Sequence, residues 1–390
     1  MTVEFISAIN VNQANELNGR TGAAIDLPWL KRYARTLDDY GFDYSLVPYG
    51  SSFHDPFTIA AAFTQVTERL RPIVALRPNT IYPTVAAKAL ATLDQLSEGR
   101  ATVHFIAGGD DHEQAREGDR LGKQQRYARQ EEYIRILRDV WTRREPFDHA
   151  GEFYAFEDFV SHVVPVNGTI PISVGGSSDD AYRQGGALAD IFGLWGEPLA
   201  DTQEQIDRID AAARAVHRVD RPRIWVTFRP IIAPTEALAW EKAERILGVL
   251  QDRASKGNLW RAKRPDGRPA NVGSQRLLDI AARQDVHDRA LWTPTATATN
   301  AGGASTALVG TPETVAAAIL DYVDLGAELI SIRGYDNFND AVDYGRYLLP
   351  LVREELAHRE RTGERGTLQT EHPGALTEDL APGLLVRAAS

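Results

Sequence analysis

The sequence predicts an α/β fold, a TIM (β/α)8 barrel with insertions. Short apolar runs alternate with longer amphipathic patterns along most of the chain. Eight such strand–helix units are the number that closes a barrel, whereas the alternative, a doubly wound open sheet, usually has fewer. The length of 390 residues exceeds that of most single domains, but it suits one barrel that carries insertions.

The expected strands are apolar runs short enough to be buried parallel strands. They lie at residues 3–9, 43–47, 72–76, 101–106, 172–174, 191–194, 224–232 and 329–332. Amphipathic helices are expected in most of the intervening segments. They lie at about residues 28–40, 56–69, 83–98, 124–143, 178–187, 201–217, 236–254 and 311–325.

The clearest of these units is PTVAAKALATLDQLSEGR, at residues 83–100. Pro83 suits the first position of a helix, where its missing N–H would have no partner in any case. One apolar stripe follows, and Gly99 can adopt the left-handed conformation that ends a helix. The stripe consists of Ala86, Ala89, Leu90, Leu93 and Leu96.

Three segments do not follow the strand–helix rhythm. Residues 144–170 are expected to form a small β excursion before the fifth strand. Residues 255–305 are a weakly patterned insertion, and long loops of this kind are commonly active-site lids. We therefore expect one domain over residues 1–359 with these two insertions, followed by an irregular C-terminal tail over residues 360–390.

Composition excludes several classes of function. The net charge of −11 argues against nucleic acid or an anionic membrane surface as a partner. The absence of cysteine excludes disulfides, thiolate metal sites and a cysteine nucleophile. The N-terminal residues do not resemble a signal peptide, and no apolar segment is long enough to span a bilayer, so a cytoplasmic protein is expected.

A glycine-rich turn follows the expected strand at residues 172–174. Gly176, Ser177 and Ser178 lead from this strand into the next helix. Glycine allows a ligand to approach the backbone closely, and the N–H groups of a helix start bind anions. From this pattern alone, a phosphate site and a simple tight turn in which Ser178 caps the helix are about equally supported.

Several segments resemble bacterial-luciferase-like flavin monooxygenases, most closely the FMNH2-dependent alkanesulfonate monooxygenases. The most specific are PTVAAKALATLDQLSEGR, VGGSSD, LWGEP and GGASTALVG, and the resemblance spans about residues 25–358. It implies a two-component enzyme in which a separate NAD(P)H:flavin reductase supplies FMNH2. Dioxygen adds to the reduced flavin, and the peroxyflavin then oxygenates a small organic substrate. That substrate class includes organosulfur compounds such as sulfonates, with C–S cleavage. The resemblance also implies a homodimer or homotetramer.

The same resemblance implies a set of cofactor ligands. Ser178 and Tyr127 correspond to residues that contact the FMN phosphate, beside Gly176 and Ser177. His104 corresponds to a position that contacts the isoalloxazine ring, and Trp195 would form a wall of the pocket. Without the resemblance, Tyr127 would be an ordinary helix residue, and His104 and Trp195 would be packed core residues.

The expected substrate side departs from the alkanesulfonate pattern. Thr227 and Arg229 stand where an Arg-x-His pair is expected, and Phe53 replaces a cysteine. Arg229 and the retained Tyr335 are predicted to hold the substrate or donate a proton, although a structural ion pair would also explain Arg229. Arg77 is a third catalytic candidate, and its alternative is a pair with a core carboxylate. Asn10, Phe53 and Thr227 are assigned to the substrate pocket.

Two alternative functions stay open. Coenzyme F420-dependent oxidoreductases share the barrel but transfer hydride. A metal-dependent barrel hydrolase would have to use His54, His104 or His112 with nearby carboxylates. No spacing typical of a metal site accompanies these residues, so no metal ligand is predicted. A flavin-binding protein without oxygenase activity would also fit the altered seventh strand.

Overall fold

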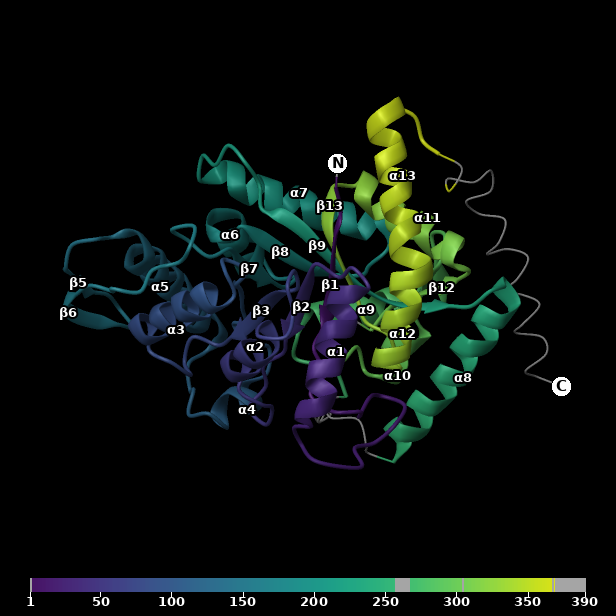
Figure 1. The fold of residues 1–390 in the computed structure, drawn as a ribbon, viewed down its shortest axis with the longest axis horizontal. Coiled ribbons are helices and arrows are strands. Elements are labelled where there is room, and N and C mark those ends of the chain that lie inside the picture. Colours follow the sequence, from purple (N-terminus) through teal and green to yellow (C-terminus); the bar gives the residue numbers. More distant parts are fainter. Residues whose placement is uncertain (1, 257–266, 304, 367, 369–390) are drawn as a thin grey trace.

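The chain folds into a closed barrel of parallel strands. The computed structural model describes residues 2–256, 267–303, 305–366 and 368. Around the barrel the strands follow the order β13, β1, β2, β3, β4, β7, β8 and β9, and β9 pairs with β13 to close it (Figure 1). Their bounds are β1 Glu4–Ala8, β2 Tyr44–Val47, β3 Arg71–Leu76, β4 Thr102–Phe105, β7 Ile172–Gly175, β8 Ile191–Trp195, β9 Arg223–Ile232 and β13 Ala327–Ile332. Each strand overlaps the run that predicted it, so the predicted TIM barrel is confirmed.

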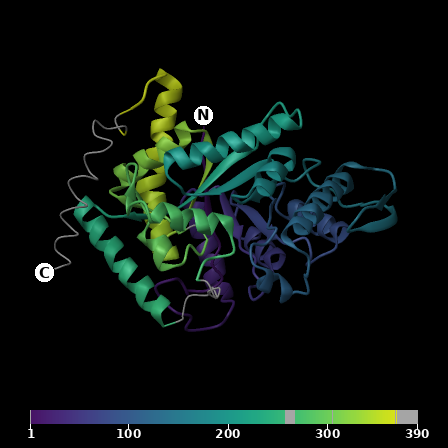
Figure 2. The same cartoon turned by 180° about the vertical axis from the view of Figure 1, so that it is seen from behind.

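The predicted helices also form, and they surround the barrel (Figures 1 and 2). Several begin at a side-chain cap, as at Asp26, whose carboxylate accepts the N–H of Trp29 at 3.1 Å. Pro83 is the first residue of its helix, as predicted. The bounds are α1 Leu27–Asp39, α2 Pro56–Thr64, α3 Pro83–Leu96, α5 Lys123–Thr142, α6 Asp179–Leu188, α7 Leu199–Ala215, α8 Glu236–Ser255 and α11 Pro312–Asp324.

Alternating strand positions build two apolar layers. One set fills the inside of the barrel, and it includes Ile6, Tyr44, Ile73, Ile191, Trp225 and Leu329. The other set packs outward against the helices, and it includes Phe5, Val74, Val103, Val174, Phe192 and Ile330. Full burial of one such side chain contributes about 1.5–3 kcal/mol, so these layers hold the barrel together.

Charged side chains close the amino-terminal end of the barrel. Glu4 of β1 contacts Arg71 of β3 and Arg223 of β9, each at 2.5 Å. Arg223 also binds Glu328 of β13 at 2.9 Å. Four strands are thus linked across one end by ion pairs. The carboxyl ends of the strands, where TIM-barrel enzymes place their chemistry, lie opposite.

The first insertion is a β-hairpin, as predicted for residues 144–170. Strands β5 Phe147–Ala150 and β6 Ala155–Phe159 pair antiparallel and project from one end of the molecule (Figure 1). Glu132 of α5 accepts the backbone N–H groups of Phe153 and Tyr154 at 3.0 and 2.9 Å. These bonds attach the hairpin to the barrel.

The second insertion is more regular than predicted. Residues 257–266 and 304 lie outside the described residues. The remainder holds α9 Val272–Ala281, β10 Val286–His287, β11 Leu291–Trp292 and α10 Pro294–Ala298. Strand β11 pairs with β12 Ala307–Gly310, which in turn pairs in parallel with the far end of β9. The prediction of a weakly patterned loop is therefore wrong for the described part, because β9 extends beyond the barrel and carries additional strands there.

Further short elements follow the barrel strands. These are α4 Asp111–Ala115, α12 Asn337–Asp343, the π-helical turn η1 Tyr344–Leu348 and α13 Leu349–Thr362. The expected tail over residues 360–390 begins inside α13, which ends at Gly363 with φ of +72°. Residues 367 and 369–390 of that tail lie outside the described residues. Within the described chain, no helix is both long enough and apolar enough to cross a bilayer.

Candidate active site

The turn after β7 brings together the residues predicted to hold a phosphate. Ser178 caps α6, and its hydroxyl lies 3.3 Å from the hydroxyl of Tyr127 on α5. Gly176 has φ of +137°, and a Cβ there would lie 3.6 Å from the Tyr127 hydroxyl. The first N–H groups of α6 have no partner within the helix, so they can donate to an anion. Burial raises the pKa of Tyr127, which keeps its phenol a neutral donor.

Both acidic residues that begin α6 lie near an arginine, although the charge of Asp180, 3.9 Å from Arg183, still acts on Tyr127. Asp179 pairs with Arg208, so its carboxylate is neutralised and lies at the surface. Arg126, beside Tyr127 in sequence, is buried and points elsewhere. It donates to the carbonyl groups of Leu121 and Gly108 at 2.7 and 3.3 Å. The cradle formed by Tyr127, Gly176, Ser177 and Ser178 therefore offers hydroxyl and backbone donors.

His104 lies inside the barrel beside this cradle. Its Nδ1 is 2.9 Å from the hydroxyl of Ser173, and its ring centroid is 5.3 Å from that of Trp225. Burial lowers the pKa of His104 to about 4, so the imidazole is neutral near pH 7. A Cβ at Gly175 or Gly193 would lie 3.4 or 3.7 Å from Cε1 of His104. The two glycines keep the wall beside His104 free of side chains.

The insertion helix α9 covers the next part of the barrel mouth. Trp195, at the end of β8, pairs in register with Thr227 of β9, and Thr227 pairs with Ser331 of β13. A Cβ at Gly273 of α9 would lie 2.9 Å from the Trp195 ring. Trp195 therefore contacts a helix that the sequence did not predict.

An ion pair attaches this helix to the barrel. Arg276 of α9 binds Glu197 at 2.7 Å, and Glu197 is only 1 % exposed. Burial raises the pKa of Glu197, and the hydrogen bond and charge of Arg276 oppose that rise without cancelling it. The pair fixes α9 next to Trp195.

Arg229 and Tyr335 lie together, as predicted, but Arg229 is already paired. The Arg229 guanidinium lies 3.8 Å from the centroid of the Tyr335 ring. It contacts Glu16 at 2.6 Å and donates to the carbonyl groups of Arg333 and Gly334 at 3.1 and 2.8 Å. The structural ion pair considered for Arg229 is thus present. A direct role of either residue in catalysis remains a prediction.

Arg77 follows β3 and also has carboxylate partners. Its guanidinium binds Glu117 at 2.7 Å and approaches Glu113 at 3.5 Å. Burial raises the pKa of Glu113, but hydrogen bonds from Ser51 and the charge of Arg77 reverse this and hold it below its ordinary value. The negative charges of Glu113 and Glu117 balance the positive charge of Arg77. An anionic substrate would therefore have to compete with both carboxylates for Arg77.

The remaining predicted pocket residues are spread around the mouth. Asn10 follows β1 and donates to the carbonyl of Ala14 at 2.9 Å. Phe53 lies in the connection between β2 and α2 and is 43 % exposed. The sequence did not indicate Glu16, Ser173 and Glu117, because each contributes through a partner distant in sequence and none belongs to a motif.

Comparison with known families agrees with this arrangement. A family model described as luciferase-like monooxygenase matches residues 6–329 of the chain. The chain belongs to the luciferase-like monooxygenase family. It therefore belongs to a family of oxidoreductase enzymes.

Solved structures of varied activity share the fold with this luciferase-like chain. A riboflavin lyase, solved with modified FMN and its substrate riboflavin, is 19 % identical, with a TM-score of 0.74 over 98 % of this chain and 99 % of the other. The EDTA monooxygenase of Chelativorans sp. BNC1 is 19 % identical, with a TM-score of 0.72 over 93 % and 98 %. An F420-dependent secondary alcohol dehydrogenase is 15 % identical, with a TM-score of 0.63 over 90 % and 100 %. At these identities the likeness shows the fold alone.

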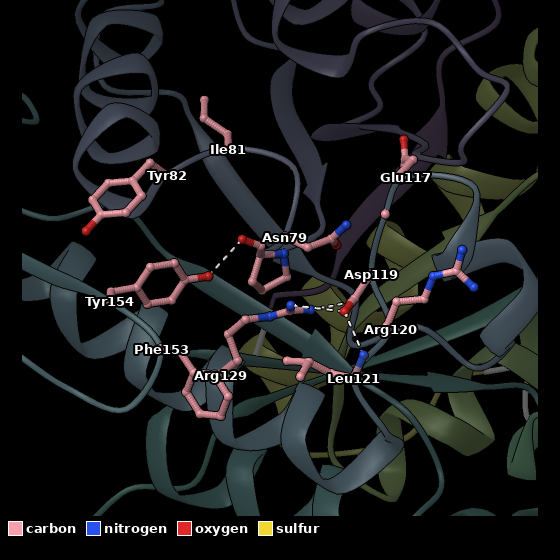
Figure 3. A pocket seen from close by; sticks show the side chains of 12 residues that line it. Asn79, Ile81, Tyr82, Glu117, Asp119, Arg120, Leu121, Arg129, Phe153 and Tyr154 are labelled. Atoms are coloured by element: carbon pink, nitrogen blue, oxygen red, sulfur yellow. Dashed lines mark hydrogen bonds and ion pairs between the residues drawn. The ribbon is translucent and has the colours of Figure 1, made fainter.

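A side pocket of about 550 Å³ lies next to the luciferase-like barrel mouth (Figure 3). The buried ion pair between Asp119 and Arg129 and the ring of Tyr154 line it, and Tyr154 donates to the carbonyl of Pro78 at 2.9 Å. None of the predicted site residues lines this pocket. Glu117 lines it and also binds Arg77, so the pocket adjoins the Arg77 cluster.

The described chain contains no group of three or more His, Asp and Glu side chains placed to hold a metal ion. His104 instead contacts Ser173 and Trp225. The metal-dependent hydrolase alternative therefore has no ligand set among the described residues.

Proposed function

We propose that this protein is a two-component, FMNH2-dependent monooxygenase that uses dioxygen to oxygenate a small organic substrate. The observation that carries the proposal is the cradle in which Tyr127, Gly176 and Ser178 meet at the carboxyl end of β7. Hydroxyl and helix N-terminal donors at this position of a TIM barrel suit a phosphate group. An organosulfur compound such as a sulfonate is the proposed substrate class.

The cofactor would supply the oxygen chemistry, since reduced flavin reacts with dioxygen. The chain's own residues orient the cofactor and exclude water. Tyr127 and Ser178 would hold its phosphate, while neutral His104 and the wall at Gly175 and Gly193 would accommodate its ring. Helix α9, attached through Arg276, would cover the mouth beside Trp195 and reduce the entry of water.

The first test measures which flavin binds. FMN and F420 are titrated into the apoprotein, and dissociation constants are read from flavin fluorescence. Tyr127→Phe and Ser178→Ala should each weaken FMN binding about ten-fold, because each removes a hydrogen bond to a charged phosphate. Thr142→Ala, at the exposed end of α5, should leave the affinity unchanged.

The outcome also separates the main alternative. F420-dependent enzymes share the barrel. If the apoprotein bound F420 and not FMN, the protein would be an F420-dependent oxidoreductase that transfers hydride. If the Tyr127 and Ser178 variants both bound FMN as tightly as the wild type, the assigned cradle would be wrong.

A second measurement addresses oxygenation. FMNH2 bound to the protein under anaerobic conditions is mixed with oxygenated buffer in a stopped-flow spectrometer. Reoxidation with a lag or an additional phase that free FMNH2 lacks is expected for a monooxygenase. Reoxidation identical to that of free FMNH2, in the presence of demonstrated FMN binding, would instead favour a flavin-binding protein without oxygenase activity.

The proposal includes partners. An NAD(P)H:flavin reductase is proposed to supply FMNH2, as the family resemblance implies. The protein is proposed to be a homodimer or homotetramer. Light scattering after size-exclusion chromatography would give its mass, and a monomer at micromolar concentration would contradict this assembly.

A further inference from the structure

Three arginines converge on one residue of the loop between β1 and α1. The Glu16 carboxylate contacts Nη1 of Arg229 at 2.6 Å and Nη2 of Arg333 at 3.0 Å. The backbone carbonyl of Glu16 accepts a hydrogen bond from Arg253 of α8 at 2.9 Å. The Glu16 carboxylate thus binds two guanidinium groups, and the third guanidinium, that of Arg253, binds the backbone carbonyl of Glu16.

The two guanidinium groups that share this carboxylate differ in exposure. The Arg229 side chain is 4 % exposed, and its Nε and both Nη atoms have partners: Glu16 and two backbone carbonyl groups. The Arg333 side chain is 40 % exposed. Within the described residues its guanidinium has one partner, Glu16, which it reaches through Nη2. Nε and Nη1 of Arg333 therefore keep donors for a ligand.

The charges around Glu16 are unequal. Burial raises the pKa of Glu16, but the charges of Arg229 and Arg333 outweigh this and hold it below its ordinary value, so the carboxylate is ionised. One negative charge thus faces two positive charges that are close to it. The excess positive charge lies on the more exposed group, Arg333.

Strand register places this group at the barrel mouth. Thr227 of β9 and Ser331 of β13 are paired neighbours. Arg229 lies two residues further along β9, and Arg333 directly follows β13, where its N–H still donates to the carbonyl of Phe228 at 3.3 Å. Side chains two residues apart along an extended chain share a face. Arg333 is thus one layer beyond the paired positions, at the carboxyl end where a barrel enzyme binds its substrate.

We propose that Arg333 binds an anionic group of the substrate, a carboxylate or a sulfonate, in competition with the Glu16 carboxylate, which Arg229 holds in place. The inference rests on the proposed function, because it concerns the substrate of that same site. A guanidinium that keeps free N–H donors suits the oxygens of either group, because each can form a charge-assisted hydrogen bond with it. The anionic group of the substrate is thus bound by Arg333 and not by Arg229, whose N–H donors already have partners.

The test uses apoprotein and needs no flavin. Methanesulfonate and acetate are the anionic probes, and dimethyl sulfone is the neutral match of methanesulfonate. Binding is measured by calorimetry at constant ionic strength for the wild type and for Arg333→Gln. The matched control is Arg346→Gln, which removes an exposed guanidinium on η1 that binds Tyr40 at 3.0 Å.

The wild type is expected to bind both anions and not dimethyl sulfone. Arg333→Gln should weaken anion binding at least ten-fold, and Arg346→Gln should not. Arg333→Lys keeps the positive charge but loses the planar guanidinium. Its affinity for the anions should lie between those of the wild type and of Arg333→Gln. Circular dichroism establishes that each variant is folded.

Glu16→Gln provides an independent readout, because a loss of folding cannot imitate tighter binding. Removing the competing carboxylate should strengthen anion binding several-fold. Equal binding by wild type and Arg333→Gln, or binding lost in Ser178→Ala but kept in Arg333→Gln, would overturn the proposal. Because no flavin is present, failure of FMN binding or of oxygenation would contradict the proposed function without changing this result.

Discussion

His104 is a titratable side chain that burial keeps neutral. Its folded-state pKa is about 4, whereas the ordinary value is 6.5. Between these two values the unfolded chain binds a proton that the folded chain does not. The free energy of unfolding should therefore fall as the pH is lowered from about 6.5 to about 4, by at most about 3 kcal/mol from this residue.

Replacing His104 should remove that pH dependence. His104→Asn cannot titrate, so the slope of stability against pH in this window should become shallower than in the wild type. Urea unfolding at several pH values between 5 and 7.5 measures it. His162→Asn, which replaces an exposed histidine in the loop after β6, is the matched substitution for comparison. A His104→Asn slope equal to that of the wild type would mean that His104 is not buried as described.

Individual residues were predictable where a motif named them. Tyr127 and Ser178 are 51 residues apart in sequence, yet their hydroxyl groups lie 3.3 Å apart, while their contact with a phosphate stays a prediction. Glu16 could not be predicted, since it stands in a loop without a pattern and its role depends on Arg229 and Arg333 far along the chain. Partners of buried charges are chosen by tertiary structure, which local sequence does not encode.

Among the elements, α9 carries the next prediction. Arg276→Gln would leave the Glu197 carboxylate buried without a counter-charge, because Arg276 is its ion-pair partner at 2.7 Å. Removing one partner of a buried pair costs about 3 kcal/mol. We expect α9 to detach locally, with faster hydrogen exchange over residues 272–281. The effect should be smaller at pH 5 than at pH 8, because burial raises the pKa of Glu197 and protonation relieves the unpaired charge.

A neighbouring arginine supplies the control for α9. Arg283 binds Asp201 at 2.9 Å, but its side chain is 56 % exposed. Arg283→Gln should change hydrogen exchange in α9 only slightly, since exposed ion pairs contribute little. Equal protection of α9 in the Arg276→Gln variant and the wild type would show that the ion pair does not hold the helix.

The barrel strands and most helices were predictable as elements, whereas the second insertion was not. Each barrel strand is an apolar run buried on both faces, which gives a strong local signal. By contrast, β10 and β11 have two residues each and α10 has five, lengths at which periodicity carries little information. Strand β12 forms because β9 continues beyond the barrel and offers it an edge, which is a tertiary cause.

At the scale of the whole molecule, the count of eight strand–helix units was enough to predict the barrel. An ion-pair cluster links the strands at the amino-terminal end of this barrel, opposite the end that holds the candidate site. Glu4 links β1 to β3 and β9 at the amino-terminal end, through Arg71 and Arg223. Glu4→Gln removes the shared negative charge and leaves both guanidinium groups facing each other. Because the cluster is only partly buried, we expect a loss of about 1–3 kcal/mol in the free energy of unfolding.

The pH dependence of this loss has a definite sign. Burial raises the pKa of Glu4, but the hydrogen bond and charge of Arg223, followed by those of Arg71, reverse this and hold it below 4.5. A carboxylate with a lowered folded-state pKa stabilises the fold above its unfolded pKa, and that contribution is lost as the pH falls through the folded value. The difference in urea-unfolding free energy between wild type and Glu4→Gln should therefore be full at pH 7 and shrink below about pH 4.5. Glu328→Gln, which removes one contact of Arg223 at the edge of the cluster, should cost less than Glu4→Gln at pH 7. If the two variants cost the same, Glu4 would not be the residue that closes this end of the barrel.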